Sequence, residues 1–161
     1  MSMAGLPNNN PQYFDVGVVD VRFGVGVKIV RPVNIYGCRL GDESFVGPFC
    51  EIQRGVVIGC RTKIQSHSFI CELVSIGDDC FIGHGVTFIN DVFAMGGPAR
   101  GDKSQWRSTS IGNNVSIGSN ATILPVTVID GAVIGAGAVV TRNIEIRGIY
   151  VGNPAKLIRR I

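Results

Sequence analysis

The sequence has little charge and few aromatic residues: 17% of its 161 residues are charged, 7% are aromatic, and one is Trp. Intrinsic disorder is excluded all the same, because 45% of the residues are hydrophobic and the formal net charge is only +3. The basic residues form no dense patch, which argues against nucleic-acid binding. Glycine is abundant instead, with 22 residues, roughly twice its ordinary frequency. This much glycine disfavours a helical bundle, and without a Gly-X-Y period it excludes collagen, so we expect a β-protein.

The sequence also lacks the marks of secretion and membrane insertion. Its first residues have neither a basic flank nor an apolar core, so they predict no signal peptide. The longest uncharged stretch, residues 108–129, contains ten Ser, Thr and Asn residues, which disfavour a membrane helix. The five cysteines form no C-x-x-C pair and their number is odd, which favours reduced thiols. We therefore expect a cytoplasmic protein that binds neither nucleic acid nor a membrane.

A repeat of six residues organises the chain, with a bulky apolar residue at one position of each unit. A glycine often follows this residue, and a small or β-branched residue lies four positions after it. The apolar positions are Phe23, Ile29, Ile35, Leu40, Val46, Ile52, Ile58, Ile64, Ile70, Ile76, Ile82, Phe88, Ile111, Ile117, Ile123, Val128, Ile134 and Val140. A period of six fits a short strand and a turn, with two inward side chains per unit and glycine easing the bend. Three units make one triangular coil, so eighteen units predict six coils in a prism roughly 29 Å tall.

The segments IGDDCFIGHGVTF, IGNNVSIGSNATI and VIGAGAVV, with the closing GNPAKLIRR, resemble the hexapeptide-repeat acyltransferase family. The similarity spans about residues 23–161 and implies an all-β fold, a left-handed parallel β-helix. We expect an N-terminal extension over residues 1–22 and the β-helix over residues 23–152. An inserted loop over residues 89–110 interrupts the β-helix, and residues 153–161 form a tail with a short helix.

The irregularities of the repeat fall at one corner of the predicted prism. Two steps, 35–40 and 123–128, are one residue short, and the step 88–111 contains the long insertion. Counting in threes places all three where the third face of a coil turns into the first face of the next coil. Long non-repeating loops in compact folds often carry function, so this corner is the first candidate for a site.

Polar residues stack at this corner. Arg54, Glu72 and Asn90 occupy equivalent positions of the third face, adjacent ones about 5 Å apart, and Asp91 follows Asn90. One interpretation is a solvated ladder in which Arg54 and Glu72 form a surface ion pair worth ~0–1 kcal/mol. The other is that Glu72 and Asn90 hold a polar group of a substrate, since an amide donates and accepts hydrogen bonds without titrating. The segment FIND resembles the family segment whose Asn borders the active site in sugar-nucleotide N-acetyltransferases. Asn90 is therefore the leading catalytic candidate, with Glu72 beside it and with Arg54 and Asp91 expected to bind the substrate.

His84, in the segment IGHGV, is the candidate general base, because related branches of the family use a histidine. It lies at the other end of the third face, roughly 15–20 Å from Asn90. The two residues could share a site only across a subunit boundary, and the resemblance implies a homotrimer with sites between neighbours. The alternative for His84, and more so for His67 one coil earlier, is an ordinary corner residue. Two histidines are too few for the three-histidine zinc site of other proteins with this fold, so we expect no metal.

The insertion combines glycines with positive charge. Gly96 and Gly97 permit a flexible arm, and Arg100 and Lys103 are candidates for binding the phosphates of a substrate. Trp106 could stack on a nucleotide base or pack against a neighbouring subunit, and we favour packing.

The last coils carry small side chains, so their turn edges leave backbone N–H groups open to an extended ligand. The resemblance implies that acetyl-CoA lies there. The residues expected to contact it are Ala136, Gly137, Ala138, Thr141, Arg142 and Lys156. The alternative is structural, since glycine and alanine also suit tight turns of a β-helix. Where relatives commonly have LPGVTIG this chain has LPVTVID, so the corner at Pro125 should be tighter.

Together, the resemblance implies an acetyl-CoA-dependent N-acetyltransferase. Its acceptor would be the amino group of a nucleotide-linked amino sugar, of the kind used to build surface polysaccharides such as lipopolysaccharide. O-acetylation of a sugar or small alcohol is the close alternative. A non-catalytic β-helical scaffold is the alternative from a different class.

Overall fold

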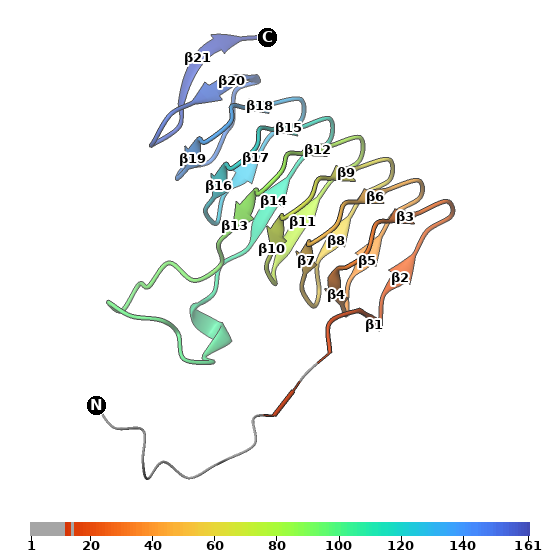
Figure 1. Ribbon diagram of the computed structural model, residues 1–161. Helices are drawn as coiled ribbons and strands as arrows, with labels where there is room; N and C mark the ends of the chain where they lie inside the picture. The colour runs from red at the N-terminus through yellow and green to blue at the C-terminus, as the bar shows by residue number, and fades with distance from the viewer. Residues whose placement is uncertain (1–11, 14) are drawn as a thin grey trace, which may run out of the picture.

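The structure is a computed structural model that describes residues 12, 13 and 15–161. Short strands wind into a parallel β-solenoid of about seven turns, with a flat sheet along each of its three sides (Figure 1). The all-β class and the triangular coil predicted from the six-residue repeat are confirmed.

Each side of the solenoid is one sheet, built from one strand of every coil. Sheet A contains β1 (Val18–Val19), β4 (Asn34–Tyr36), β7 (Glu51–Ile52), β10 (Phe69–Ile70), β13 (Thr87–Phe88), β16 (Thr122–Ile123) and β19 (Val139–Val140). Sheet B contains β2 (Arg22–Phe23), β5 (Arg39–Leu40), β8 (Val57–Ile58), β11 (Val74–Ile76), β14 (Thr109–Ile111) and β17 (Thr127–Val128). Sheet C contains β3 (Lys28–Ile29), β6 (Phe45–Val46), β9 (Lys63–Ile64), β12 (Phe81–Ile82), β15 (Ser116–Ile117), β18 (Val133–Ile134), β20 (Gly148–Val151) and β21 (Lys156–Arg160).

Equivalent residues of the repeat lie directly above one another. Ile58 pairs with Ile76 in sheet B, and Ile64 pairs with Ile82 in sheet C, both in parallel register. The three faces assigned by counting in threes are therefore the three sheets: face one is sheet B, face two is sheet C and face three is sheet A. This register places every corner of the prism by residue number.

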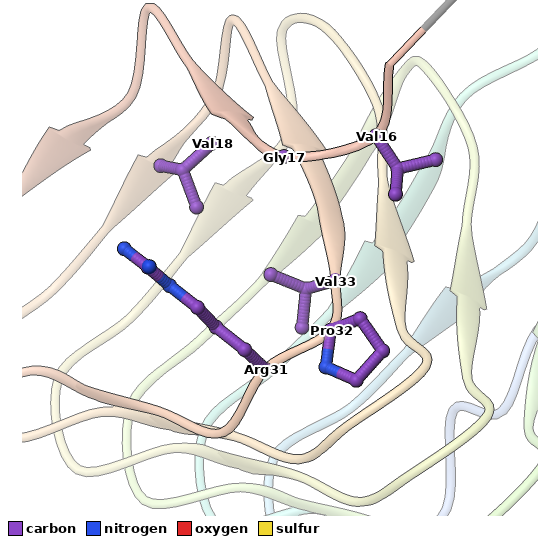
Figure 2. A pocket seen from close by; sticks show the side chains of 6 residues that line it. All are labelled: Val16, Gly17, Val18, Arg31, Pro32 and Val33. Atoms are coloured by element: carbon purple, nitrogen blue, oxygen red, sulfur yellow. The ribbon is translucent and has the colours of Figure 1, made fainter.

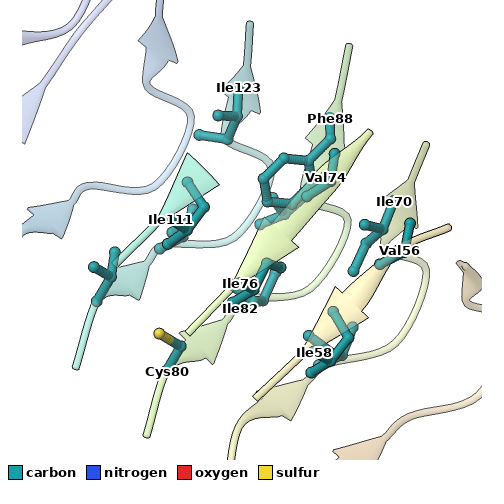
Figure 3. Packing of buried hydrophobic residues seen from close by; sticks show 14 of the residues in the cluster. Val56, Ile58, Ile70, Val74, Ile76, Cys80, Ile82, Phe88, Ile111 and Ile123 are labelled. Atoms are coloured by element: carbon teal, nitrogen blue, oxygen red, sulfur yellow. The ribbon is translucent and has the colours of Figure 1, made fainter. Parts of the chain in front are cut away.

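The core is the column of aliphatic side chains that the repeat sends into the prism. Ile58, Ile76 and Ile111 stack from coil to coil, and Phe88 lies above Ile70 (Figure 3). Ile70, Phe88 and most other inward residues have no exposed surface. The small residue four positions later is mostly buried too, and several of the polar ones bond to the next coil, although the buried Ser44 hydroxyl has no partner. Thr62 Oγ1 donates to the carbonyl of Gly77 at 2.8 Å, and Cys80 Sγ donates to that of Gly112 at 3.1 Å.

The glycine after each inward aliphatic residue is required by close packing of successive coils. A Cβ at Gly47 would lie 2.7 Å from the backbone nitrogen of Ser66, and one at Gly83 would lie 2.6 Å from that of Ser119. Neither glycine has a positive φ, so the expectation that these glycines ease the bend is wrong. The chain bends two residues later, at left-handed positions such as Gly85, where φ is 65°.

Both ends of the chain differ from expectation. The first coil begins within the predicted extension, because β1 already pairs with β4. Sheet A therefore has seven strands, and the solenoid has about seven turns in place of six. The predicted C-terminal helix is wrong: residues 156–160 form β21, which pairs antiparallel with β20. Gly148 in β20 permits this pairing, because a side chain there would collide with Leu157.

Candidate active site

The insertion leaves the prism at the corner between sheets A and B, as the register predicted. It begins after β13 and ends where β14 starts, and it projects from the side of the solenoid (Figure 1). Its one regular element is the short 3-10 helix η1 (Lys103–Gln105), which Asp102 caps by accepting a hydrogen bond from the Ser104 backbone.

Asn90 is fixed at the base of this insertion by the coil beneath it. Its amide nitrogen Nδ2 donates to the backbone carbonyl of Glu72 at 3.2 Å. The backbone N–H of Glu72 in turn donates to Gln53 Oε1 at 3.2 Å. Both backbone polar groups of Glu72 are therefore bonded to side chains, and the bond from Nδ2 turns the carbonyl oxygen Oδ1 of Asn90 away from the Glu72 backbone. That oxygen is a hydrogen-bond acceptor with no charge and no titration near neutral pH.

The insertion folds back onto Glu72 through a lysine. Lys103 Nζ lies 2.8 Å from Oε1 and 2.7 Å from Oε2 of Glu72, and it also sits 5.2 Å from the ring centre of Trp106. Lys103, predicted to bind a substrate phosphate, thus holds the insertion against the coil. The Glu72 side chain is 21% exposed and that of Lys103 is 57% exposed, so water weakens the pair. The predicted ladder pair of Arg54 with Glu72 is replaced by this contact, and Arg54 packs against Gly37.

Asp91, expected to bind the substrate, organises the insertion. Its Oδ1 accepts from the backbone N–H of Phe93 at 3.0 Å, and its Oδ2 accepts from that of Ala99 at 2.7 Å. Ala99 is buried, so this carboxylate ties the loop to a packed position. Arg100, the next residue, is exposed and has a left-handed backbone with φ of 51°.

His84 lies at a different corner, between sheets C and A. Its Nδ1 is 2.8 Å from the hydroxyl of Ser66, one coil below, which fixes the orientation of the ring. The six steps from His84 to Asn90 cross one side of the prism along β13, a span of about 20 Å at ~3.3 Å per residue. The two predicted catalytic residues therefore do not meet within one chain.

The residues predicted to contact acetyl-CoA lie on the last coils and are partly accessible. Ala136, Gly137, Thr141, Arg142 and Lys156 are exposed. Ala138 is different, because its side chain is buried in the core and its N–H donates to the carbonyl of Gly135 at 3.2 Å.

Sequence reasoning missed a polar network on the outer face of sheet A. Gln53 Nε2 donates to Glu51 Oε1 at 2.8 Å, and the Tyr36 hydroxyl donates to the same oxygen at 3.4 Å. Burial, followed by the negative charges of Glu51 and Glu72, raises the pKa of Tyr36. Tyr36 and Gln53 each follow an inward isoleucine, so the column one position after the aliphatic residue was the signal that could have found them. Among the described residues, no group of three His, Cys, Asp or Glu side chains is arranged to hold a metal ion.

Comparisons with known proteins find relatives of the repeat. Residues 73–89 and 108–142 match the family model described as the hexapeptide repeat of succinyl-transferase. The repeat of this chain is thus similar to that of the hexapeptide-repeat transferases. A bifunctional GlmU protein of Nocardia farcinica is 32% identical over 157 residues, which cover 89% of this chain and 30% of that protein. The chain thus spans less than a third of the length of this relative.

Solved structures of the hexapeptide-repeat family share the fold. An acetyltransferase of Vibrio cholerae, crystallised with acetyl-CoA, superposes with a TM-score of 0.64 at 26% identity, over 77% of this chain and 70% of that chain. A maltose O-acetyltransferase of Clostridium difficile has a TM-score of 0.63 at 22% identity, over 89% and 70% of the two chains, which shows similarity of fold. Within the described residues, no helix combines the length and the apolar composition needed to span a bilayer.

Proposed function

We propose that this protein transfers the acetyl group of acetyl-CoA to the amino group of a nucleotide-linked amino sugar used in surface-polysaccharide biosynthesis. The donor is supported by the Vibrio cholerae relative, which was crystallised with acetyl-CoA. The exposed small residues Ala136 and Gly137 and the cations Arg142 and Lys156 supply a surface on the last coils for an extended, phosphorylated donor.

The orientation of Asn90 carries the choice of acceptor. One N–H of Nδ2 donates to the Glu72 carbonyl, and this contact fixes the amide so that Oδ1 is the acceptor available to a ligand. An amine N–H can donate to it, which holds the nitrogen lone pair toward the thioester carbonyl. In the reaction the nitrogen forms the C–N bond, the C–S bond breaks, and the sulfur leaves as the thiol of CoA after taking up a proton. Positioning of this kind can lower the barrier by several kcal/mol, with an upper range of about 7–11 kcal/mol.

An amine acceptor also suits a site in which the Asn90 amide cannot accept a proton. A neutral amine is a nucleophile before it loses a proton, whereas an alcohol must lose its proton as it attacks. The Asn90 amide cannot take that proton, and the corner around it is held by Glu72, Gln53 and Lys103.

O-acetylation is the second candidate, and the Ser66–His84 contact favours it. The hydroxyl at 2.8 Å from Nδ1 holds the imidazole ring in place, which suits a general base. His84 reaches Asn90 only from a neighbouring copy, so we propose a homotrimer in which each site combines the His84 corner of one chain with the Asn90 corner of the next.

The test measures the release of CoA thiol from acetyl-CoA with amino-sugar nucleotides as acceptors, alongside CoA binding by calorimetry. We expect the protein to bind CoA and to release its thiol from acetyl-CoA only when an amine acceptor is present. Turnover with hydroxyl sugars but with no amine would establish the second candidate. No CoA binding at millimolar concentration would contradict both and leave a scaffold.

A further inference from the structure

Two rings stack at the corner between sheets C and A, at positions that other coils fill with small residues. The ring centres of Phe49 and His67 are 4.9 Å apart and the ring planes are inclined by 30°. Both residues have left-handed backbones, with φ of 61° for Phe49 and 63° for His67. The equivalent positions on higher coils are Gly85, Asn120 and Gly137, all with positive φ. Glycine and asparagine suit this conformation, while a bulky residue there costs free energy.

The strained phenylalanine is also left largely in water. Phe49 is 57% exposed, although its inward neighbours Val46 and Cys50 are buried. One face of its ring contacts His67, so the other face is the one turned toward the N-terminal end of the prism. This second face of the ring is therefore accessible to a ligand.

A cavity lies against this ring. It has a volume of about 270 Å³, and its walls include Phe49, Pro32 and Val33, with the polar side chains of Asn34 and Glu51 at its side. A second cavity of about 320 Å³ shares Pro32 and Val33 with the first and adds a cation, Arg31. Figure 2 shows the Arg31 side chain extending from this turn toward Val18.

We propose that Phe49 and His67 form the platform on which the base of the nucleotide-linked substrate stacks. An aromatic ring face with polar groups beside it is the chemistry that recognises a nucleoside base. Trp106, the other candidate for stacking, already has Lys103 over its ring at 5.2 Å.

The two rings lie at a height along the prism that suits the proposed function, and the assignment of the platform rests on that function. His67 is one coil and Phe49 is two coils below His84, so the rings lie about 5 and 10 Å from it along the prism at ~4.8 Å per coil. If the His84 corner of one copy faces Asn90 of the next, the base at Phe49 and the amino sugar near His84 belong to one extended molecule.

The test is a calorimetric titration with UDP, dTDP and GDP as probes, and with ribose 5-phosphate as a probe that has no base. Phe49→Asn removes the ring, and asparagine adopts the left-handed backbone conformation readily, so the melting temperature should not fall. The matched control is Glu43→Asn, which changes a residue with φ of 55° at the corner between sheets B and C.

We expect at least one nucleoside diphosphate to bind the native protein. Phe49→Asn should weaken that binding by about 5- to 100-fold, the range given by aromatic stacking on one base. Glu43→Asn should leave it within about twofold, because its corner lacks the rings, and ribose 5-phosphate should bind both variants equally weakly.

Absence of binding by every nucleoside diphosphate, or equal binding by Phe49→Asn and the native protein, would overturn the platform. These results are separable from the proposed function. Acetylation of a simple amino sugar without nucleotide binding would retain amine acetylation and remove the platform. Phe49-dependent nucleotide binding without any acetylated amine would retain the platform and remove the proposed acceptor chemistry.

Discussion

Asn90→Ala is the most informative substitution, because the structure separates its effect on stability from its effect on turnover. The variant loses one neutral hydrogen bond, from Nδ2 to the Glu72 carbonyl at 3.2 Å. Such a bond contributes about 0.5–1.5 kcal/mol to the free energy of unfolding. For a chain of this length, the melting temperature should fall by about 1–6 °C at roughly 2–4 °C per kcal/mol. The fold should therefore persist.

The effect of Asn90→Ala on turnover should be much larger. Loss of the acceptor Oδ1 leaves the amine unoriented, and misplacement by about 1 Å can cost 100-fold in rate. We expect kcat for acetyl transfer to fall by about that factor, measured as thiol release at saturating acetyl-CoA. Asn90→Asp is the matched comparison: a carboxylate accepts from the amine but favours its protonated, non-nucleophilic form. Its turnover should be low at neutral pH and should recover as pH rises. Turnover within about threefold of the native value in folded Asn90→Ala would refute the assigned role.

Two further predictions concern the coil. Gly83→Ala should destabilise the protein by about 1–3 kcal/mol, since its Cβ would lie 2.6 Å from the Ser119 nitrogen. Gly97→Ala, where a Cβ meets nothing within 4 Å, should be nearly neutral in the same thermal melt, and equal effects would contradict the close-packing explanation. Burial raises the pKa of Cys71 to about 12 and that of Cys38 to about 11. The stabilisation from keeping these thiols neutral should therefore be fully present below the unfolded-state thiol pKa near 8.5. The free energy of unfolding should fall as pH rises toward the folded-state pKa values, because the unfolded thiols ionise first. Denaturant titrations between about pH 7 and pH 11 would show this decline, and a stability that rises over the range would be inconsistent with buried thiols.

The central coils could be predicted because one physical rule governs them. An aliphatic residue every six positions fills a narrow prism, so counting alone placed Ile58 above Ile76 and put the insertion at the corner between sheets A and B. The ends escaped this rule. Residues 18–19 join sheet A through pairing with β4, and residues 156–160 form a strand because β20 offers them an edge. Both depend on tertiary pairing, which the repeat does not encode.

The candidate site was predictable where it follows the register. Asn90 and Glu72 were placed one coil apart by counting, and a hydrogen bond joins them in the structure. The path of the insertion has no period, so the contact of Lys103 with Glu72 could not be foreseen. Gln53 was missed for a different reason: the column after the inward aliphatic residues marks its position, but its bridge between Glu51 and the Glu72 backbone depends on side-chain geometry.

Amine acetylation next to Asn90 is tested most directly by a matched pair of acceptors. The two are the same nucleotide sugar with an amino group or a hydroxyl group at one carbon, and the measurement is kcat/KM for thiol release from acetyl-CoA. The orientation of Asn90 predicts that the amino acceptor is preferred by at least about 100-fold, and that Asn90→Ala removes most of this preference. Equal values for the two acceptors, or preference for the hydroxyl sugar, would contradict it.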